Sequence, residues 1–147
     1  ALKVAETEIA YADGCEEFDM VINVGRLKDG QTDYVRDEIA AIVKAAKGKT
    51  VKVIIETGLL TDEEKAIATR LSCEAGAHYV KTCSGVSQGV ATVADITLMK
   101  ANLSGDVKLK ASSGIRTYED AKALIEAGAE RLGTSAGIAI VTGAPKA

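Results

Sequence analysis

The stretch VKVIIETGLLTDEEKAIATRLSCEAGAHYVKT, residues 51–82, contains one strand–helix–strand unit. Its two ends, VKVIIET and AHYVKT, are short runs rich in apolar and β-branched residues, which favour strands. Between them, Thr61 with Glu64 three residues later is a capping-box pattern that begins a helix. The sequence EAGA ends that helix, because Gly76 can adopt the left-handed conformation. The stretch therefore predicts two strands joined by a helix, which is typical of a parallel sheet.

The same alternation continues on both sides of this unit. Strand-like runs recur at a spacing of roughly 25 to 30 residues, with helical periodicity between them. Thr92 with Asp95 and Thr117 with Asp120 repeat the capping pattern. A second EAGA at 126–129 and the sequence ADGC at 12–15 give further helix ends, so the chain is expected to begin inside a helix. The remaining strand-like runs are FDMVINV at 18–24, VKLKA at 107–111 and, more weakly, RLGTS at 131–135.

Composition narrows the class of protein. The 147 residues, 47% hydrophobic and 27% charged, predict one globular domain, residues 1–147, with a buried core. A net charge of -3, no basic tract and few aromatic residues argue against a nucleic-acid partner. No apolar run reaches the roughly 20 residues of a membrane span, so no membrane partner is expected and the cytoplasm is the default location. Three cysteines and one histidine predict neither a disulfide framework nor a metal site.

Polar residues end all five predicted strands. In parallel α/β folds the ligand site forms at the carboxyl ends of the strands, so these positions are candidates for a site. The strand-end residues are Asp19, Asn23, Glu56, Thr57, Lys81, Thr82, Lys110, Ser112, Thr134 and Ser135.

Charged residues also fall on shared strand faces. Because side chains alternate along a strand, Asp19 and Asn23 share one face of the first strand, and Lys52 and Glu56 share one face of the second. Buried charges are costly unless they are paired. We therefore expect either a functional site or structural ion pairs on these faces, and for Asp19 and Glu56 both interpretations stay open.

Two lysines indicate a specific chemistry. If Lys81 and Lys110 face one pocket, burial and like-charge repulsion would lower the pKa of one of them. A neutral lysine amine can attack a carbonyl and form a Schiff base, whose iminium carbon withdraws electrons from a carbon–carbon bond. The residues alone leave an alternative, in which both lysines extend into solvent at the ends of their strands.

Two glycine- and serine-containing loops indicate phosphate binding. The segments ASSGIRTYED at 111–120 and LGTSAG at 132–137 each follow a predicted strand and precede a helix start. Backbone N–H groups at helix starts bind anions, and glycine allows a phosphate to approach closely. Turns of this composition also occur for structural reasons alone.

Five motifs in order, EFDMVINVGRLKDG, VKVIIETGLLTDEEK, YVKTCSGV, VKLKASSGIRTYEDA and RLGTSAGIAIV, together resemble the later part of class I 2-deoxyribose-5-phosphate aldolases. The resemblance covers almost the whole chain. It implies reversible cleavage of 2-deoxyribose 5-phosphate to glyceraldehyde 3-phosphate and acetaldehyde, without metal or organic cofactor. Its expected partners are a phosphorylated sugar or a small aldehyde.

The resemblance also assigns roles to residues. Lys81 matches the lysine that forms the Schiff base, Lys110 matches the second lysine that tunes it, and Asp19 matches an acid that moves protons through a water. The family's phosphate-binding loops match Ser112, Ser113, Gly114, Gly133, Thr134 and Ser135.

The chain departs from the family pattern in three respects. The family fold is an eight-stranded TIM (β/α)8 barrel, and this α/β chain resembles only its last five strands. Five strands cannot close a barrel, so we expect a partial barrel that is completed or covered by self-association into a dimer or larger homo-oligomer. Cys83 replaces a small hydroxyl residue, either as a tolerated isostere or as a redox-sensitive thiol. Ser113 replaces a glycine and would either crowd the phosphate or add a donor.

Two hypotheses follow. The first is a short aldolase that assembles and keeps Schiff-base chemistry, with activity reduced because the early strands of the barrel have no counterpart. The second is a half-barrel-like protein that self-associates and binds phosphate without turnover. Lys81, Lys110 and Asp19 favour the first, whereas the missing strands favour the second.

Overall fold

The computed structural model describes residues 2–144 and has the predicted α/β architecture. Five parallel strands form one sheet in the order β1-β2-β3-β4-β5, so strands that are neighbours along the chain are also neighbours in space. Each lies within a few residues of its predicted run, which confirms the fold class. The strands are β1 (Glu17–Val21), β2 (Thr50–Ile54), β3 (Tyr79–Lys81), β4 (Lys108–Ser112) and β5 (Arg131–Gly133).

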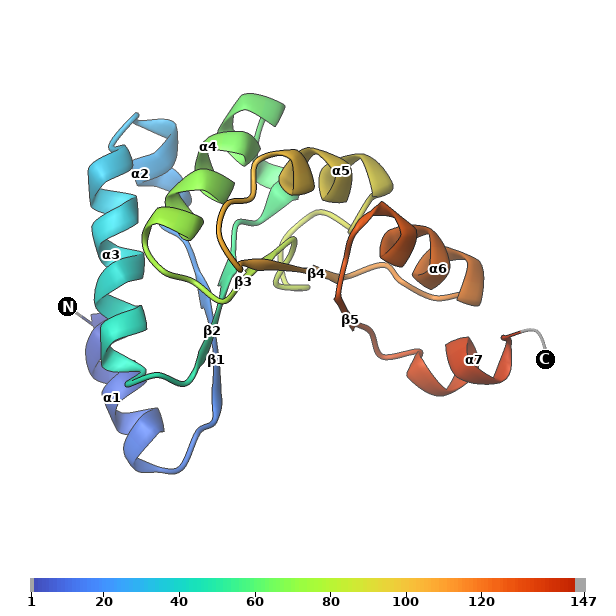
Figure 1. Cartoon of the computed structure of the whole chain (residues 1–147), viewed down its shortest axis with the longest axis horizontal. Helices are drawn as coiled ribbons and strands as arrows, with labels where there is room; N and C mark the ends of the chain where they lie inside the picture. Colours follow the sequence, from blue (N-terminus) through green and yellow to red (C-terminus); the bar gives the residue numbers. More distant parts are fainter. Residues whose placement is uncertain (1, 145–147) are drawn as a thin grey trace.

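Helices connect the strands and cover one side of the sheet. Figure 1 shows α3, α4, α5 and α6 along the outer side of a curved sheet, with α1 and α7 near its two ends. Within residues 2–144 no helix covers the inner side of the sheet, and the sheet curves as in an incomplete barrel (Figure 1). The helices are α1 (Leu2–Ala12), α2 (Val24–Lys28), α3 (Thr32–Ala45), α4 (Asp62–Glu74), α5 (Val93–Ala101), α6 (Tyr118–Ala127) and α7 (Gly137–Thr142), with one 3₁₀ turn, η1 (Thr57–Leu59).

The predicted helix caps are present with one difference. Thr61 and Thr117 form complete capping boxes with the acids three residues later. Thr92 also accepts a hydrogen bond from the backbone N–H of Asp95, but the Asp95 carboxylate pairs with Lys65 Nζ at 2.7 Å. This ion pair ties α5 to α4, so the acid at that position contributes to helix packing as well as to its own helix start.

Alternation along the strands separates an apolar layer from a charged one. On β1, Phe18 and Met20 are buried in the hydrophobic core, whereas Glu17 and Asp19 lie on the opposite face. On β3, Val80 belongs to the core and Lys81 lies on the opposite face. The core therefore fills the space between sheet and helices, and the inner face of the sheet is left to polar side chains.

Within residues 2–144 the sheet is open, because β1 and β5 each pair with a single strand. A cavity of about 440 Å³ follows the free edge of β1, and Phe18 and Met20 contribute to its wall. Lys3 Nζ donates to the carbonyl oxygen of Val21 at 2.8 Å and so satisfies one backbone acceptor at the end of this edge strand. No helix in this part of the chain is long and apolar enough to cross a membrane. The single-domain organisation and the cytoplasmic location stay predictions.

Candidate active site

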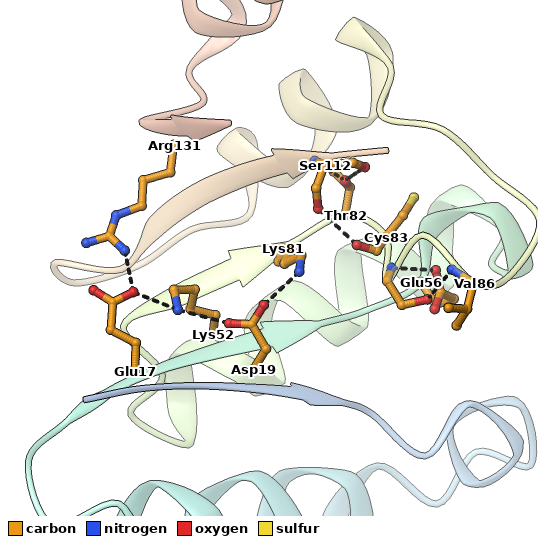
Figure 2. A network of polar contacts seen from close by, with 11 residues as sticks. Glu17, Asp19, Lys52, Glu56, Lys81, Thr82, Cys83, Val86, Ser112 and Arg131 are labelled. Carbon is orange, nitrogen blue, oxygen red and sulfur yellow. Dashed lines mark hydrogen bonds and ion pairs between the residues drawn. The ribbon is translucent and has the colours of Figure 1, made fainter. Parts of the chain in front are cut away.

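Three neighbouring strands bring an acid and two lysines together on the inner face of the sheet. Asp19 on β1 lies between Lys52 on β2 and Lys81 on β3, as Figure 2 shows. One carboxylate oxygen of Asp19 is 2.7 Å from Lys81 Nζ, and the other is 2.9 Å from Lys52 Nζ. Strand register explains this, since Asp19 is directly opposite Lys52 and side chains on one face repeat every second residue.

The cluster is largely shielded from solvent even in the open sheet. The side chain of Lys81 is 11% exposed and that of Lys52 is 6% exposed. Burial alone would raise the pKa of the Asp19 carboxyl, but the hydrogen bonds from Lys81 and Lys52 hold that pKa below its ordinary value. Asp19 is therefore ionised at neutral pH and keeps Nζ of Lys81 in a fixed position.

Lys110 differs from the two paired lysines. It lies directly opposite Lys81 in the β3–β4 register, and it takes part in none of the ion pairs among residues 2–144. Burial lowers the pKa of Lys110, and the charges of Lys81 and Lys52 add to that lowering against the opposing effect of Asp19. The two causes expected from the sequence, burial and neighbouring positive charge, thus both lower the pKa of Lys110.

A cavity of about 410 Å³ lies at the carboxyl ends of β3, β4 and β5. Lys81 is part of its wall, so the cavity reaches the charged cluster. Arg116, which was not among the predicted site residues, adds a positive charge. The structure brings together here all six residues that were predicted to bind phosphate, Ser112, Ser113, Gly114, Gly133, Thr134 and Ser135.

Several hydroxyl groups of this cavity already donate to the protein backbone. Ser112 Oγ donates to the carbonyl oxygen of Cys83, and Thr134 Oγ1 donates to that of Ile115. Ser113 Oγ donates to the carbonyl oxygen of Gly89. A hydroxyl that donates its only proton in this way cannot also donate to a phosphate. In this arrangement the remaining donors to an anion include backbone N–H groups, Ser135 and Arg116.

The start of α6 contributes less to anion binding than its sequence indicated. The carboxylate of Asp120 accepts hydrogen bonds from the backbone N–H groups of Arg116 and Thr117. These two donors are therefore satisfied within the capping box, and the expectation of free N–H groups at this helix start is wrong for them.

Gly133 keeps the wall of the cavity open. A Cβ at this position would lie 2.7 Å from Cβ of Ser112 and 3.3 Å from Cε of Lys110. Any side chain at residue 133 would therefore displace both neighbours, which explains why β5 passes the end of Lys110 with a glycine.

Two other strand-end expectations change with the structure. Asn23 lies beyond β1, where its side chain caps α2 by accepting from the backbone N–H of Arg26. Glu56 lies beyond β2 in a left-handed conformation and points toward the loop after β3. Lys52 was placed on a strand face by its two-residue spacing but not among the site residues, and the β1–β2 register sets it opposite Asp19. Cys83 is buried, with Sγ 3.4 Å from Thr57 Oγ1, which favours the isostere interpretation.

The fold and the site together define a barrel-type α/β protein with a lysine-centred cluster at the carboxyl ends of its strands. The sequence model of the DeoC/LacD family aldolases matches residues 1–143. The chain therefore belongs to the DeoC/LacD aldolase family.

Individual relatives agree with this family. The deoxyribose-phosphate aldolase of Bdellovibrio bacteriovorus is 54% identical over 141 residues, which are 96% of this chain and 64% of that protein. The aldolase QR15 superposes with a TM-score of 0.89 at 40% identity, over 96% of this chain and 64% of that one. The tetrameric deoxyribose phosphate aldolase of Aeropyrum pernix superposes with a TM-score of 0.82 at 30% identity, over 95% and 59%. The chain spans about two thirds of the length of the curated relatives it matches.

Proposed function

We propose that this chain is a class I aldolase that reversibly cleaves 2-deoxyribose 5-phosphate to glyceraldehyde 3-phosphate and acetaldehyde. The observation that carries the proposal is the juxtaposition of Lys81, its partners Asp19 and Lys110, and an adjoining cavity with phosphate-binding character. A substrate with an aldehyde at one end and a phosphate at the other suits a cavity whose wall includes both the buried amine of Lys81 and the positive charge of Arg116.

Lys81 is the proposed nucleophile. Its amine, once neutral, adds to the substrate aldehyde, and loss of water gives an iminium ion. Removal of the proton from the C3 hydroxyl then breaks the C2–C3 bond, glyceraldehyde 3-phosphate leaves, and the bonding electrons form an enamine on Lys81. Protonation of the enamine and hydrolysis release acetaldehyde and restore the lysine.

Lys110 and Asp19 are the proposed proton-transfer partners. Because burial and neighbouring positive charges lower the pKa of Lys110, a larger share of its amine is neutral than in an ordinary lysine, and this neutral form can take up the proton that Lys81 must lose. Asp19, held ionised by Lys81 and Lys52, can accept and return a proton through a water beside the reacting carbons. The chemistry uses no group other than these side chains and water.

Self-association belongs to the same proposal. Both edge strands of the sheet are unpaired among residues 2–144, and a second copy would cover exposed edges and the polar inner face. A tetrameric relative fits a dimer or larger homo-oligomer.

The test is reductive trapping of the Schiff base. The purified protein is incubated with acetaldehyde or 2-deoxyribose 5-phosphate and borohydride, and adducts are located by intact mass and peptide mapping. We expect a single adduct on Lys81 and none in Lys81→Leu. Lys108→Leu is the matched control, since Lys108 lies two residues before Lys110 on β4 and pairs with Glu130. Labelling spread over surface lysines, or activity that survives Lys81→Leu, would contradict the assignment.

A second candidate is a phosphate-binding partial barrel without turnover. The open sheet and the two-thirds coverage of the relatives favour it. Binding of 2-deoxyribose 5-phosphate in the absence of any Lys81 adduct would identify this alternative.

A further inference from the structure

The loop that follows β3, residues 83–90, lies between the ends of β2 and β4, the two strands that flank β3. It begins two residues after Lys81, and Ser84 and Gly85 contribute to the wall of the phosphate cavity. Its tip reaches solvent, where the side chain of Val86 is 94% exposed. The position of this loop therefore affects both the proposed nucleophile and the proposed phosphate site.

Glu56 contacts the loop from the end of β2. Its side chain is buried, and one carboxylate oxygen accepts a hydrogen bond from the backbone N–H of Ser84 at 3.0 Å. Figure 2 shows Glu56 beside the chain segment that carries Cys83 and Val86. Burial alone would raise the pKa of Glu56, but the hydrogen bonds from Ser84 and the charge of Lys81 lower it, so the carboxylate is ionised. A charged acceptor makes this the stronger kind of hydrogen bond.

Residues next to Glu56 press against the same loop. Thr57 Oγ1 lies 3.4 Å from Cys83 Sγ, and the backbone N–H of Thr57 donates to the carbonyl oxygen of Thr82. A Cβ on Gly58 would collide with the backbone of Gln88 and lie 2.8 Å from Cα of Gly89. The turn after β2 and the loop after β3 are therefore packed backbone against backbone.

Ser113 contacts the loop from the other side, at the end of β4. Its hydroxyl donates to the carbonyl oxygen of Gly89 at 3.1 Å, and its own carbonyl oxygen accepts from the backbone N–H of Ala91. Of the two roles open from the sequence, donation to a phosphate does not fit this arrangement, because the hydroxyl already donates its proton to Gly89. The hydroxyl is directed to the loop.

Glu56 and Ser113 also share an unusual backbone conformation. Their φ angles are 61° and 81°, and Lys47 is the one other non-glycine residue with positive φ in the described part of the chain. Such conformations cost free energy and persist where the surrounding structure fixes them. Two strained residues that flank one loop and both hydrogen-bond to it indicate a common task.

We propose that Glu56 and Ser113 are positioning residues, which hold the loop of residues 83–90 as part of the wall of the phosphate cavity, beside Lys81. By fixing this wall they favour phosphorylated over unphosphorylated substrates. The selectivity for phosphorylated substrates rests on the proposed aldolase function, whereas the fixing of the loop by Glu56 and Ser113 does not. Neither residue touches the reacting atoms, and both act through the loop.

The first measurement is hydrogen exchange of residues 84–90, which requires no activity. Glu56→Ala removes the acceptor, and Ser113→Ala removes the donor but keeps the side-chain carbon. We expect amide exchange in the loop to rise about tenfold in either variant, the effect of one lost hydrogen bond. Glu56→Gln is the rescue control, because its amide oxygen can still accept from Ser84, and we expect exchange within threefold of the parent protein.

The second measurement separates positioning from general damage. The concentration that half-saturates borohydride trapping on Lys81 is determined for 2-deoxyribose 5-phosphate and for acetaldehyde. In Glu56→Ala and Ser113→Ala we expect this half-saturating concentration to rise about tenfold for 2-deoxyribose 5-phosphate and less than twofold for acetaldehyde. A variant that is only destabilised would trap both substrates less well, by the same factor.

Ser113→Gly provides a variant that is expected to fold even if Glu56→Ala does not, because glycine relieves the positive φ. It lacks the hydroxyl, so the loop should exchange as in Ser113→Ala. Unchanged exchange in both Ser113 variants, or equal losses for the two substrates, would overturn the proposal. If the parent protein gives no Lys81 adduct, the aldolase function and the selectivity fail together, and the exchange data alone decide whether the loop is held.

Discussion

Replacing Asp19 with Asn tests whether the charged cluster is a stabilising unit of the sheet. The substitution keeps the size of the side chain and removes the charge that faces Lys81 at 2.7 Å and Lys52 at 2.9 Å. Hydrogen bonds to charged groups contribute about 1.5–3 kcal/mol each, against about 1 kcal/mol for neutral ones. Asp19 is 33% exposed, which favours the lower end of that range because solvent screens the pair.

The two contacts together give an expected loss of about 2 kcal/mol in the free energy of unfolding at pH 7. For a chain of this size that corresponds to a fall of about 4–8 °C in Tm. The assay is urea and thermal unfolding followed by circular dichroism at several protein concentrations, so that any change in assembly is detected. Asp37→Asn is the control. Its side chain is 68% exposed and pairs with Arg36, so a loss below about 0.5 kcal/mol is expected.

The lowered pKa of Asp19 determines how the stability difference between the two proteins changes with pH. The pKa of Asp19 in the folded chain is below the ordinary value of 3.8, so its stabilising effect is complete above that pH and is lost as pH falls through the folded-state pKa. The difference in stability between Asp19→Asn and the parent protein should therefore shrink on acidification below pH 4. Equal stability of the two proteins at pH 7, or a difference that stays constant down to pH 3, would refute the reasoning.

Three further predictions concern the site and the assembly. Lys110→Met should slow borohydride trapping on Lys81 at pH 7 by about 10²-fold and move its rise to higher pH, since the base with the lowered pKa is gone; an unchanged pH profile would contradict this. Gly133→Ala should lower the free energy of unfolding by about 1–3 kcal/mol in urea titrations, because its Cβ would lie 2.7 Å from that of Ser112, and a neutral effect would show that β5 can shift. Light scattering at micromolar concentration should report a dimer or larger assembly, and a well-folded monomer would disprove the argument from the open edges of β1 and β5.

Local sequence patterns were sufficient to predict part of the site. The two-residue alternation placed Asp19 on a charged strand face, and the polar strand ends located Lys81 and the phosphate cavity. Arg116 was missed, because an arginine just before a helix start carries no sign of the cavity to which it contributes. Lys52 was placed on the correct face, yet its pairing with Asp19 depended on the register between β1 and β2, which a single sequence does not specify.

The sequence by itself determined the five βα units, because strand runs, threonine caps and glycine helix ends are local properties of a few residues. Only the tertiary structure decided which way Glu56 and Ser113 face. Ser113, after β4, was expected at the phosphate site, and Glu56, after β2, was left open between a functional site and an ion pair. Both instead turn to the loop after β3, with positive φ angles. That outcome depends on the close packing of three loops that are distant in sequence. Their tertiary contacts stabilise positive φ angles that the backbone of each residue alone would disfavour.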